Sequence, residues 1–260
     1  MIGAPGPSSP SMKTYEPLNV PKRVTDDVWI VDGPLISFGV AGVKMPFPTR
    51  MTIIRLRDAS LWLHSPTAPD PALLASITAL GPVHYLIAPN PIHYWWIPDW
   101  QRQFPGAVTY AAPGVATRAE RHGRTFRIDH TFDVDPTAET AWAETIACRV
   151  VESRFMSEAV FLHRPSRTLI LTDLVENFEP QKLESLWLRF LTWAGAVQDP
   201  AGSMPRDMRL GFGREARTRL HEHVRAMIAW RPERIILAHG RWYERDGTAE
   251  LRRAFEWLDV

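Results

Sequence analysis

Four residues of types that bind metal ions or transfer protons stand at the ends of short apolar runs of the sequence. The runs are 61–64, 84–88, 168–173 and 234–238, and the residues at or just beyond their ends are His64, His93, Asp173 and His239. Three imidazoles and a carboxylate are ligands that zinc and iron accept in proteins. Because strands hold the residues at their ends in place while solvent can still reach them, this pattern predicts a metal site at a sheet edge.

Each of these residues also has a structural interpretation when it is taken alone. A histidine at a strand end is more often a hydrogen-bonded structural residue than a metal ligand. Asp173 is also placed to cap the segment 174–176 that follows it. The metal interpretation therefore depends on four such residues occurring at four strand ends.

The elements that would position these residues alternate between strands and helices. Strands are expected at residues 28–31, 51–57, 61–64, 84–88, 108–111, 143–151, 159–163, 168–173 and 234–238. Helices are expected at residues 71–80, 93–103, 116–121, 180–194, 214–230 and 248–258, and a Gly- and Pro-rich loop at 37–48. Hairpins occur in both halves and helices follow each set of strands. This order favours an α+β fold, a four-layer αββα sandwich of two sheets packed face to face with helices outside.

Composition and charge exclude several classes of protein. The 260 residues carry 30 Lys and Arg against 29 Asp and Glu, and this net charge of +1 gives no support for nucleic-acid binding. Cys148 is the only cysteine, which excludes a disulfide framework and a Cys-rich zinc module and is typical of a reducing compartment. We find no apolar run of about 20 residues and no signal peptide, so we expect no membrane partner and a cytoplasmic location.

The chain is expected to form one domain after a short leader. Its start is rich in Gly, Pro and Ser and has little to bury, so residues 1–14 are expected to be flexible. The chain as a whole has 45% hydrophobic and 23% charged residues, which is ordinary for a folded protein. Residues 15–260 are therefore expected to form a single domain, a size that sandwiches often reach.

The sequence around the four candidate residues resembles an uncharacterised-domain family of the metallo-β-lactamase-like superfamily. The segments that carry the resemblance are 61–66 (LWLHSP), 88–90 (APN) with His93, 165–169 (PSRTL), 172–174 (TDL) and 238–240 (AHG). They agree in order and spacing, and the resemblance extends from about residue 20 to the end. It implies an αββα sandwich with its site at the edge of the two sheets, the architecture that the order of elements also favours.

The main metal motif of that superfamily is not intact in this sequence. The motif is His-x-His-x-Asp-His directly after a strand, and the matching strand here ends at Asn90. Ile92, Tyr94 and Trp95 stand at the next three motif positions and replace none of the expected ligands. His93 lies between these positions, so it matches the motif only if the turn is rearranged.

The rest of the superfamily's ligand set is present only in part. A further histidine is expected just before residue 159, where Glu152 and Glu158 are the nearby acids and no histidine occurs. The resemblance places Asp173 at the usual bridging carboxylate and His239 at the usual last histidine. A standard centre with two metal ions is therefore not expected.

Two functions of different classes remain open, and the first is a divergent metallohydrolase acting on a small molecule. A single Zn, Fe or Mn ion would be held by some of the four strand-end residues, lower the pKa of a bound water to about 7 and polarise a carbonyl or phosphoryl oxygen. Asp173 and His239 are predicted to be catalytic, and Glu152 or Glu158 is a candidate base. We favour this function because His64, which has no standard counterpart in the superfamily, stands where a replacement ligand would.

The second function is metal-free binding of an apolar or aromatic small molecule without catalysis. Its pocket would be lined by Tyr94, Trp95, Trp96 and Trp187. Bulky aromatic residues at the motif positions support this function, because they would fill the space of a second ion. The three tryptophans also have a structural interpretation as core packing beneath a helix. The oligomeric state is open, and an exposed tryptophan within 93–103 is where we would first expect a partner surface.

Overall fold

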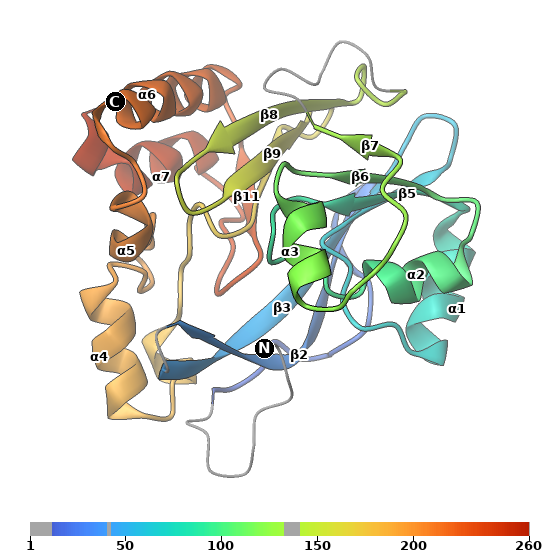
Figure 1. Ribbon diagram of the computed structural model, residues 1–260, viewed down its shortest axis with the longest axis horizontal. Helices are drawn as coiled ribbons and strands as arrows, with labels where there is room; N and C mark the ends of the chain where they lie inside the picture. Colours follow the sequence, from blue (N-terminus) through green and yellow to red (C-terminus); the bar gives the residue numbers. More distant parts are fainter. Residues whose placement is uncertain (1–11, 41–42, 133–140, 260) are drawn as a thin grey trace.

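The computed structural model describes residues 12–40, 43–132 and 141–259 and arranges them in four layers (Figure 1). Two β-sheets pack face to face, and helices lie on the outer side of each sheet. The α+β, αββα architecture predicted from the order of elements is confirmed.

The larger sheet contains seven strands of the described residues, in sequence order. They are β1 (Lys22–Thr25), β2 (Val28–Val40), β3 (Val43–Arg55), β4 (Leu61–His64), β5 (Val83–Ala88), β6 (Val108–Ala111) and β7 (His130–Thr131). Strands β1 to β4 pair antiparallel, whereas β4 to β7 pair parallel. The parallel strands therefore end at the same edge of the sheet.

The smaller sheet has the strand order β11-β10-β9-β8. Its strands are β8 (Ile146–Glu152), β9 (Ser157–His163), β10 (Thr168–Leu171) and β11 (Arg234–Leu237). β8, β9 and β10 pair antiparallel, as expected for the hairpin between β9 and β10, and β11 adds parallel to β10. The carboxyl ends of β10 and β11 therefore lie side by side.

The helices lie on the outer sides of the sheets and at one edge. They are α1 (Pro71–Leu80), α2 (Ile97–Gln103), α3 (Val115–Arg121), α4 (Leu186–Ala194), α5 (Arg206–Arg209), α6 (Arg214–Ala229) and α7 (Gly247–Ala254), with 3₁₀ turns at Pro180–Lys182 and Glu256–Leu258. The first three flank the larger sheet, α6 and α7 cover the smaller one, and α4 and α5 follow one side of the molecule (Figure 1). The start of α1 is as predicted, because the Asp70 side chain accepts the backbone N–H of Leu73 at 2.9 Å.

The core lies between the sheets and beneath α6 and α7. β9 shows how one strand serves both regions, because successive side chains point to opposite faces. Ala159 and Phe161 pack between the sheets, whereas Val160 and Leu162 pack toward the helices. Cys148 is buried among the inter-sheet residues, in agreement with its interpretation as a small hydrophobic residue.

The prediction of a loop at 37–48 is wrong, because residues 37–40 continue β2 and residues 43–48 belong to β3, while residues 41–42 lie outside the described residues. Ile36 pairs with Phe47 well beyond the expected end of the strands. Met45 and Phe47 pack against a small cluster that contains Phe178, a residue far away in the sequence. Gly and Pro in this segment indicated a loop, but contacts with a distant part of the chain stabilise the strands.

Two of the expected helices begin later than predicted. In the segment 93–103, α2 begins only at Ile97, because the Asn90 side chain accepts two backbone N–H groups and holds the preceding residues in a turn. In the segment 180–194, a 3₁₀ turn comes first and α4 begins after Ser185, whose side chain accepts the N–H of Trp187.

The amino-terminal part of the described chain packs on the domain. Residues 1–11 of the expected leader lie outside the described residues. Met12 is buried and bridges to Leu183, and the N–H of Lys13 donates to the Lys182 carbonyl at 2.8 Å. Among the described residues, we find no helix with the length and apolar character needed to cross a membrane.

Candidate metal centre

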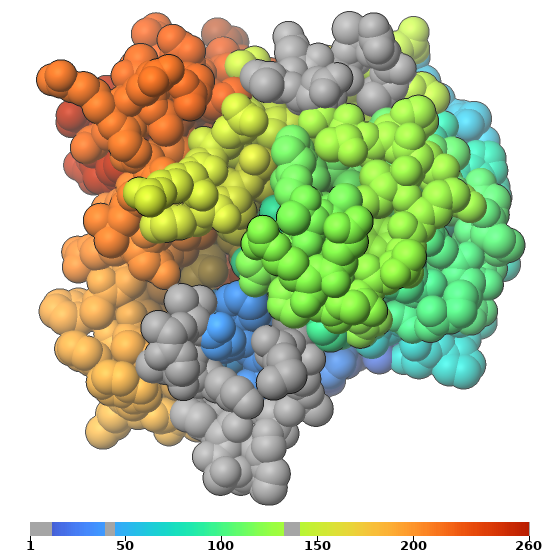
Figure 2. Space-filling model, in the orientation of Figure 1, coloured from blue at the N-terminus to red at the C-terminus, as the bar shows by residue number. Residues whose placement is uncertain are grey.

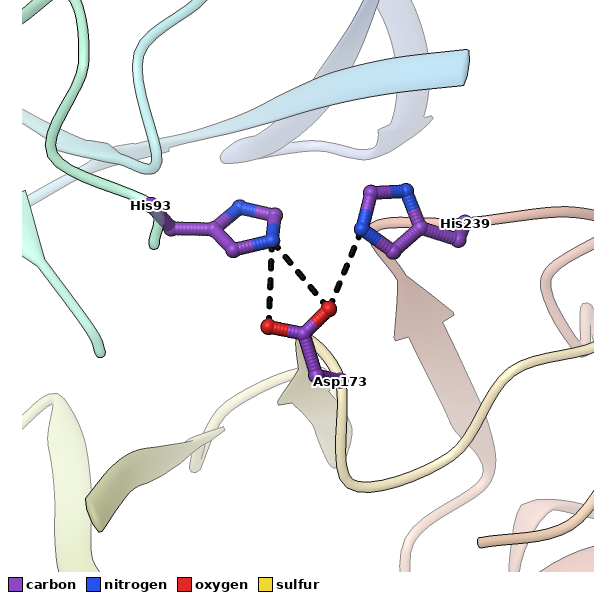
Figure 3. Close-up of side chains that lie close together, drawn as sticks. All are labelled: His93, Asp173 and His239. Carbon is purple, nitrogen blue, oxygen red and sulfur yellow. Dashed lines mark hydrogen bonds and ion pairs between the residues drawn. The ribbon is translucent and has the colours of Figure 1, made fainter. Parts of the chain in front are cut away.

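The carboxyl ends of strands from both sheets bring His93, Asp173 and His239 together (Figure 3). Leu171 of β10 lies opposite Leu237 of β11 as the last pair of these parallel strands. Asp173 and His239 each follow this pair by two residues, so the register places them next to each other. His93 approaches from the larger sheet, on the turn that follows β5.

The spacing of this His–Asp–His centre fits a shared metal ion. One donor atom from each residue lies within 4.8 Å of the other two. Asp173 Oδ1 is 3.1 Å from His239 Nε2 and 3.4 Å from His93 Nε2, and His93 Nε2 also lies 3.3 Å from Asp173 Oδ2. These distances are longer than the about 2.7–2.9 Å of a charge-assisted N–H···O bond. Two ligands that are each about 2.0–2.1 Å from a tetrahedral ion lie about 3.3 Å apart, which matches the observed distances.

The hydrogen bond on the far side of His239 determines which nitrogen faces Asp173. His239 Nδ1 lies 2.8 Å from the carbonyl oxygen of Pro48, which can only accept, so Nδ1 carries the proton. In the neutral ring, Nε2 then presents a lone pair to the Asp173 carboxylate. Two such groups repel each other unless a cation lies between them or the ring takes a second proton. The arrangement is the one that metal-binding histidines show.

His93 is held in a similar way from the larger sheet. Its Nδ1 lies 2.7 Å from the hydroxyl of Ser65, the residue directly after β4. Ser65 has a left-handed backbone, with φ of 51°, which is uncommon for a residue other than glycine. With Nδ1 engaged by Ser65, the nitrogen of His93 that faces Asp173 is Nε2.

Asn90 connects His93 to Asp173. It is fully buried, and its Nδ2 donates to Asp173 Oδ2 at 2.6 Å and to the Thr172 hydroxyl at 2.9 Å. Its Oδ1 accepts the N–H groups of Ile92 and His93, at 2.8 and 2.9 Å. One side chain thus fixes both the turn that carries His93 and the orientation of the Asp173 carboxylate.

Glu158 holds the backbone on which Asp173 lies. Its two carboxyl oxygens accept the N–H groups of Thr172, Asp173 and Leu174 at 2.8–3.0 Å. Burial and the nearby Asp173 charge raise the pKa of Glu158 to about 7. Burial alone would raise the pKa of Asp173 as well, but His93 and His239 hold that pKa well below its usual range. Asp173 therefore stays ionised between the two imidazoles.

The chain segment that carries His239 is fastened to the larger sheet. Arg50 is buried, and its Nη1 donates to the carbonyls of Leu237 and Gly240, at 2.6 and 2.9 Å. The same guanidinium pairs with Asp32 at 2.7 Å. Gly240 has φ of 86°, and a Cβ there would collide with the backbone of Asn177, so only glycine fits after His239.

Comparison with known protein families identifies the chain. The family model described as "Domain of unknown function (DUF4336)" matches residues 25–208, well over half of the sequence. The chain belongs to this family. No curated protein matches the sequence significantly.

Solved structures of metallo-β-lactamases share the fold of this family member. The enzyme from Pontibacter korlensis superposes with a TM-score of 0.58 at 15% identity, over 95% of this chain and 99% of that chain. The enzyme from Hirschia baltica gives 0.57 at 14%, over 95% and 98%. FIM-1 from Pseudomonas aeruginosa, in its mono-zinc form, gives 0.54 at 16%, over 98% and 99%. The chain is therefore a family member with the metallo-β-lactamase fold, as its motifs predicted.

His64 is the one predicted ligand that the structure does not bring into the centre. Its side chain is buried between the sheets, stacked on Trp62 at 5.6 Å and edge-on to Phe161. Residues two apart on a strand share a face, so His64 follows Trp62 into the core. Its Nε2 has no hydrogen-bond partner among the described residues, and burial lowers the pKa of His64 to about 3.

The four aromatic residues expected to line a ligand pocket do not share one environment. Tyr94 is buried and stacks on Phe126, while Trp95 and Trp96 are half-buried at the edge of the same core. Trp187 lies on α4 and is 52% exposed. Trp95 and Trp96 therefore pack against the core, Trp187 does not, and these positions give no support to a shared aromatic pocket.

The two candidate bases, Glu152 and Glu158, and a third acid, Glu176, occupy three different environments. Glu152 is exposed at the end of β8, and Glu158 has both oxygens engaged by backbone N–H groups. Glu176 is buried, and the charges of His239 and Asp173 act on its carboxyl group. Burial raises the pKa of Glu176 to about 8, so its carboxyl group is largely protonated at neutral pH.

Sequence reasoning missed the groups that hold the two histidines. They are the Ser65 hydroxyl, the Pro48 carbonyl and the Arg50 guanidinium. A backbone carbonyl has no signature in the sequence. Arg50 stands directly before the expected strand at 51–57, and that position alone does not show that its charge is buried.

Proposed function

We propose that this protein is a metal-dependent hydrolase of a small molecule, with one divalent ion held by His93, Asp173 and His239. The observation that carries the proposal is the convergence of two Nε2 atoms on one carboxylate at 3.1–3.3 Å, while each Nδ1 is engaged elsewhere. An ionised carboxylate and two oriented imidazoles form a donor set suited to Zn, Fe or Mn. Asp173 and His239 are the residues whose loss should affect the chemistry most.

The contacts of Asn90 support a single ion in the proposed centre. Its Nδ2 donates a hydrogen bond to Asp173 Oδ2, the carboxylate oxygen that a second ion would need, while Oδ1 faces both histidines. Among the described residues, the group able to hold an ion consists of His93, Asp173 and His239. Tyr94, which stands at a motif position, directs its hydroxyl to His122 instead. These observations support a centre with a single ion, and FIM-1, which shares the fold, has been determined in a mono-zinc form.

In the proposed centre the ion would supply the reactive chemistry, and the residues of the chain would hold and orient its ligands. A divalent ion supplies a Lewis acid for a carbonyl or phosphoryl oxygen and lowers the pKa of water. Ser65 and the Pro48 carbonyl keep both imidazoles in the required orientation. Three protein ligands leave coordination positions open for water and substrate, as in catalytic zinc sites.

Hydrolysis assays with controlled metal content test this function. The protein would be stripped with chelator, reloaded with Zn, Fe(II) or Mn, and assayed on ester, lactone and phosphoester substrates. We expect activity to require one of these metals, to be lost in His239→Ala and to survive in His64→Phe, because His64 lies outside the centre. Hydrolysis that persists in chelator or in His239→Ala would refute the proposal.

A further inference from the structure

Helix α4 exposes an apolar face that nothing in the described chain covers. Leu186, Trp187, Phe190 and Trp193 are exposed to 81, 52, 52 and 65%. We call these four residues the α4 face, and Figure 2 shows α4 in light orange at the left side of the molecule. Contiguous apolar surface of this kind marks interaction sites on soluble proteins. The tryptophans of 93–103, where a partner surface was expected, are instead half-buried or buried.

The α4 face is held rigid from behind. Leu188 and Thr192 on the opposite side of the helix are buried, and Leu188 packs with Phe178 and Val197. The exposed rings contact one another, with Trp187 stacked on Phe190 at 5.7 Å between ring centroids. The helix therefore cannot turn these side chains inward without breaking its own packing. A rigid aromatic surface loses little conformational entropy when a partner covers it.

The charges of α4 argue against a lipid surface and for an apolar protein partner. Helices that bind anionic lipid surfaces carry several Lys or Arg residues on their polar side. Arg189 is the one charged residue within α4, and its Nε donates to the Leu183 carbonyl at 3.0 Å. Apolar aromatic surface with few charges is typical of the centre of a protein–protein interface.

The area of the α4 face suits a symmetric dimer. An aromatic side chain offers about 150–250 Å², so at the observed exposed fractions the three rings present about 250–420 Å², to which Leu186 adds. A standard interface buries about 800 Å² on each partner, of which somewhat more than half is apolar. The α4 face thus supplies most of the apolar part of one standard interface, and a two-fold axis lets the same patch cover itself.

We propose that the α4 face forms the centre of a two-fold dimer interface with the α4 face of a second copy of this chain. The inner side of α4 packs in the same small cluster as Phe47, whose ring is 5.1 Å from that of His239. The proposed interface is therefore connected to the His–Asp–His centre through the packing of Phe47. The residues of that centre all come from one chain. The proposal does not depend on the function of the centre.

Sedimentation equilibrium of the full chain over about 1–100 µM tests the dimer. We expect a dimer in the wild type and a dissociation constant raised about 30-fold or more in Trp193→Glu, the loss typical of a buried aromatic at an interface centre. Leu186→Glu should also weaken the dimer. Leu210→Glu is its matched control, because Leu210 is exposed to 80% but lies outside α4. Circular dichroism should show all three variants folded.

Sedimentation and a vesicle-binding experiment together distinguish a second copy of the chain from other partners for the α4 face. A wild type that stays monomeric at about 100 µM would overturn the proposal, as would a Trp193→Glu dissociation constant equal to that of the wild type. Flotation with vesicles of phosphatidylcholine and phosphatidylglycerol provides the lipid comparison. We expect no binding, and binding that Trp193→Glu abolishes in a monomeric wild type would assign the α4 face to a lipid surface instead.

Discussion

At the scale of single residues, Asp173 is the group on which the candidate centre depends. Its carboxylate lies between two imidazole nitrogens and accepts a third contact from the Asn90 amide. Such supporting contacts orient ligands, and their loss commonly lowers metal affinity about 10- to 100-fold. Asn90 is therefore as informative to change as the ligands themselves.

Asn90→Ala should weaken metal binding while leaving all three proposed ligands in the chain. We expect zinc affinity about 10- to 100-fold lower and a free energy of unfolding lower by about 1–3 kcal/mol, because buried N–H groups lose their acceptor. Competitive chelator titration and urea unfolding measure the two effects. Gln101→Ala is the control, since the Gln101 side chain also accepts a backbone N–H, from Arg127, and has no hydrogen bond to the three proposed ligands. An unchanged zinc affinity in Asn90→Ala would remove Asn90 from the site.

The sequence alone could predict which residue types would gather but not where each side chain would point. The ends of parallel strands meet at one edge, and this placed His93, Asp173 and His239 together. His64 has the same position at a strand end, yet its neighbour two residues earlier is the buried Trp62, and the two share a face. That alternation was the available signal that His64 enters the core.

At the scale of elements, the β2–β3 hairpin and β11 hold each other in place beside the centre. Arg50 of β3 bonds the carbonyls of Leu237 and Gly240, and its ion pair with Asp32 lies almost entirely out of water. The Gly- and Pro-rich composition of residues 37–48 could not reveal this hairpin, because its strands are stabilised by packing on a distant cluster. Local sequence carries no record of such contacts.

Arg50→Met should destabilise the protein far more than the loss of an exposed arginine. Asp32 would keep its ion pair with Lys22 at 2.9 Å, but the buried carbonyls of Leu237 and Gly240 would lose their donor, so we expect the free energy of unfolding to fall by about 3 kcal/mol. Arg57→Met is the matched control, because Arg57 pairs with Glu144 while exposed to 71%, and such pairs contribute about 0–1 kcal/mol. Urea unfolding compares the two variants. An equal loss of unfolding free energy in the two variants would show that Arg50 does not link β3 to the segment after β11.

At the scale of the whole molecule, folding removes several histidines from water. The order of hairpins and helices was sufficient to predict the αββα layers, because each amphipathic element must bury its apolar side against another. How deeply a given polar residue is buried depends on both sheets together, which the pattern of one strand does not determine. His163 at the end of β9 is such a residue, and burial lowers its pKa to about 4.

Buried His163 should make stability depend on pH in a defined window. Below about pH 6.5 the unfolded imidazole takes up a proton, whereas the folded one does so only near pH 4. The contribution of neutral, buried His163 to the free energy of unfolding is therefore complete above pH 6.5. It is lost as the pH falls toward 4, at up to about 1.4 kcal/mol per pH unit. His163→Gln keeps a partner for the Ser166 hydroxyl and removes the titration. The stability difference between wild type and variant should change with this slope, and a constant difference would contradict the assignment.

The most direct test of the central claim is the metal content of the purified chain. Protein prepared without chelator, and again after loading with Zn, Fe or Mn, would be measured by elemental analysis alongside its variants. The account predicts one tightly bound ion per chain in the wild type and in His64→Phe, and none in His93→Ala, Asp173→Ala or His239→Ala. Two ions per chain, or no ion retained under any loading, would contradict it.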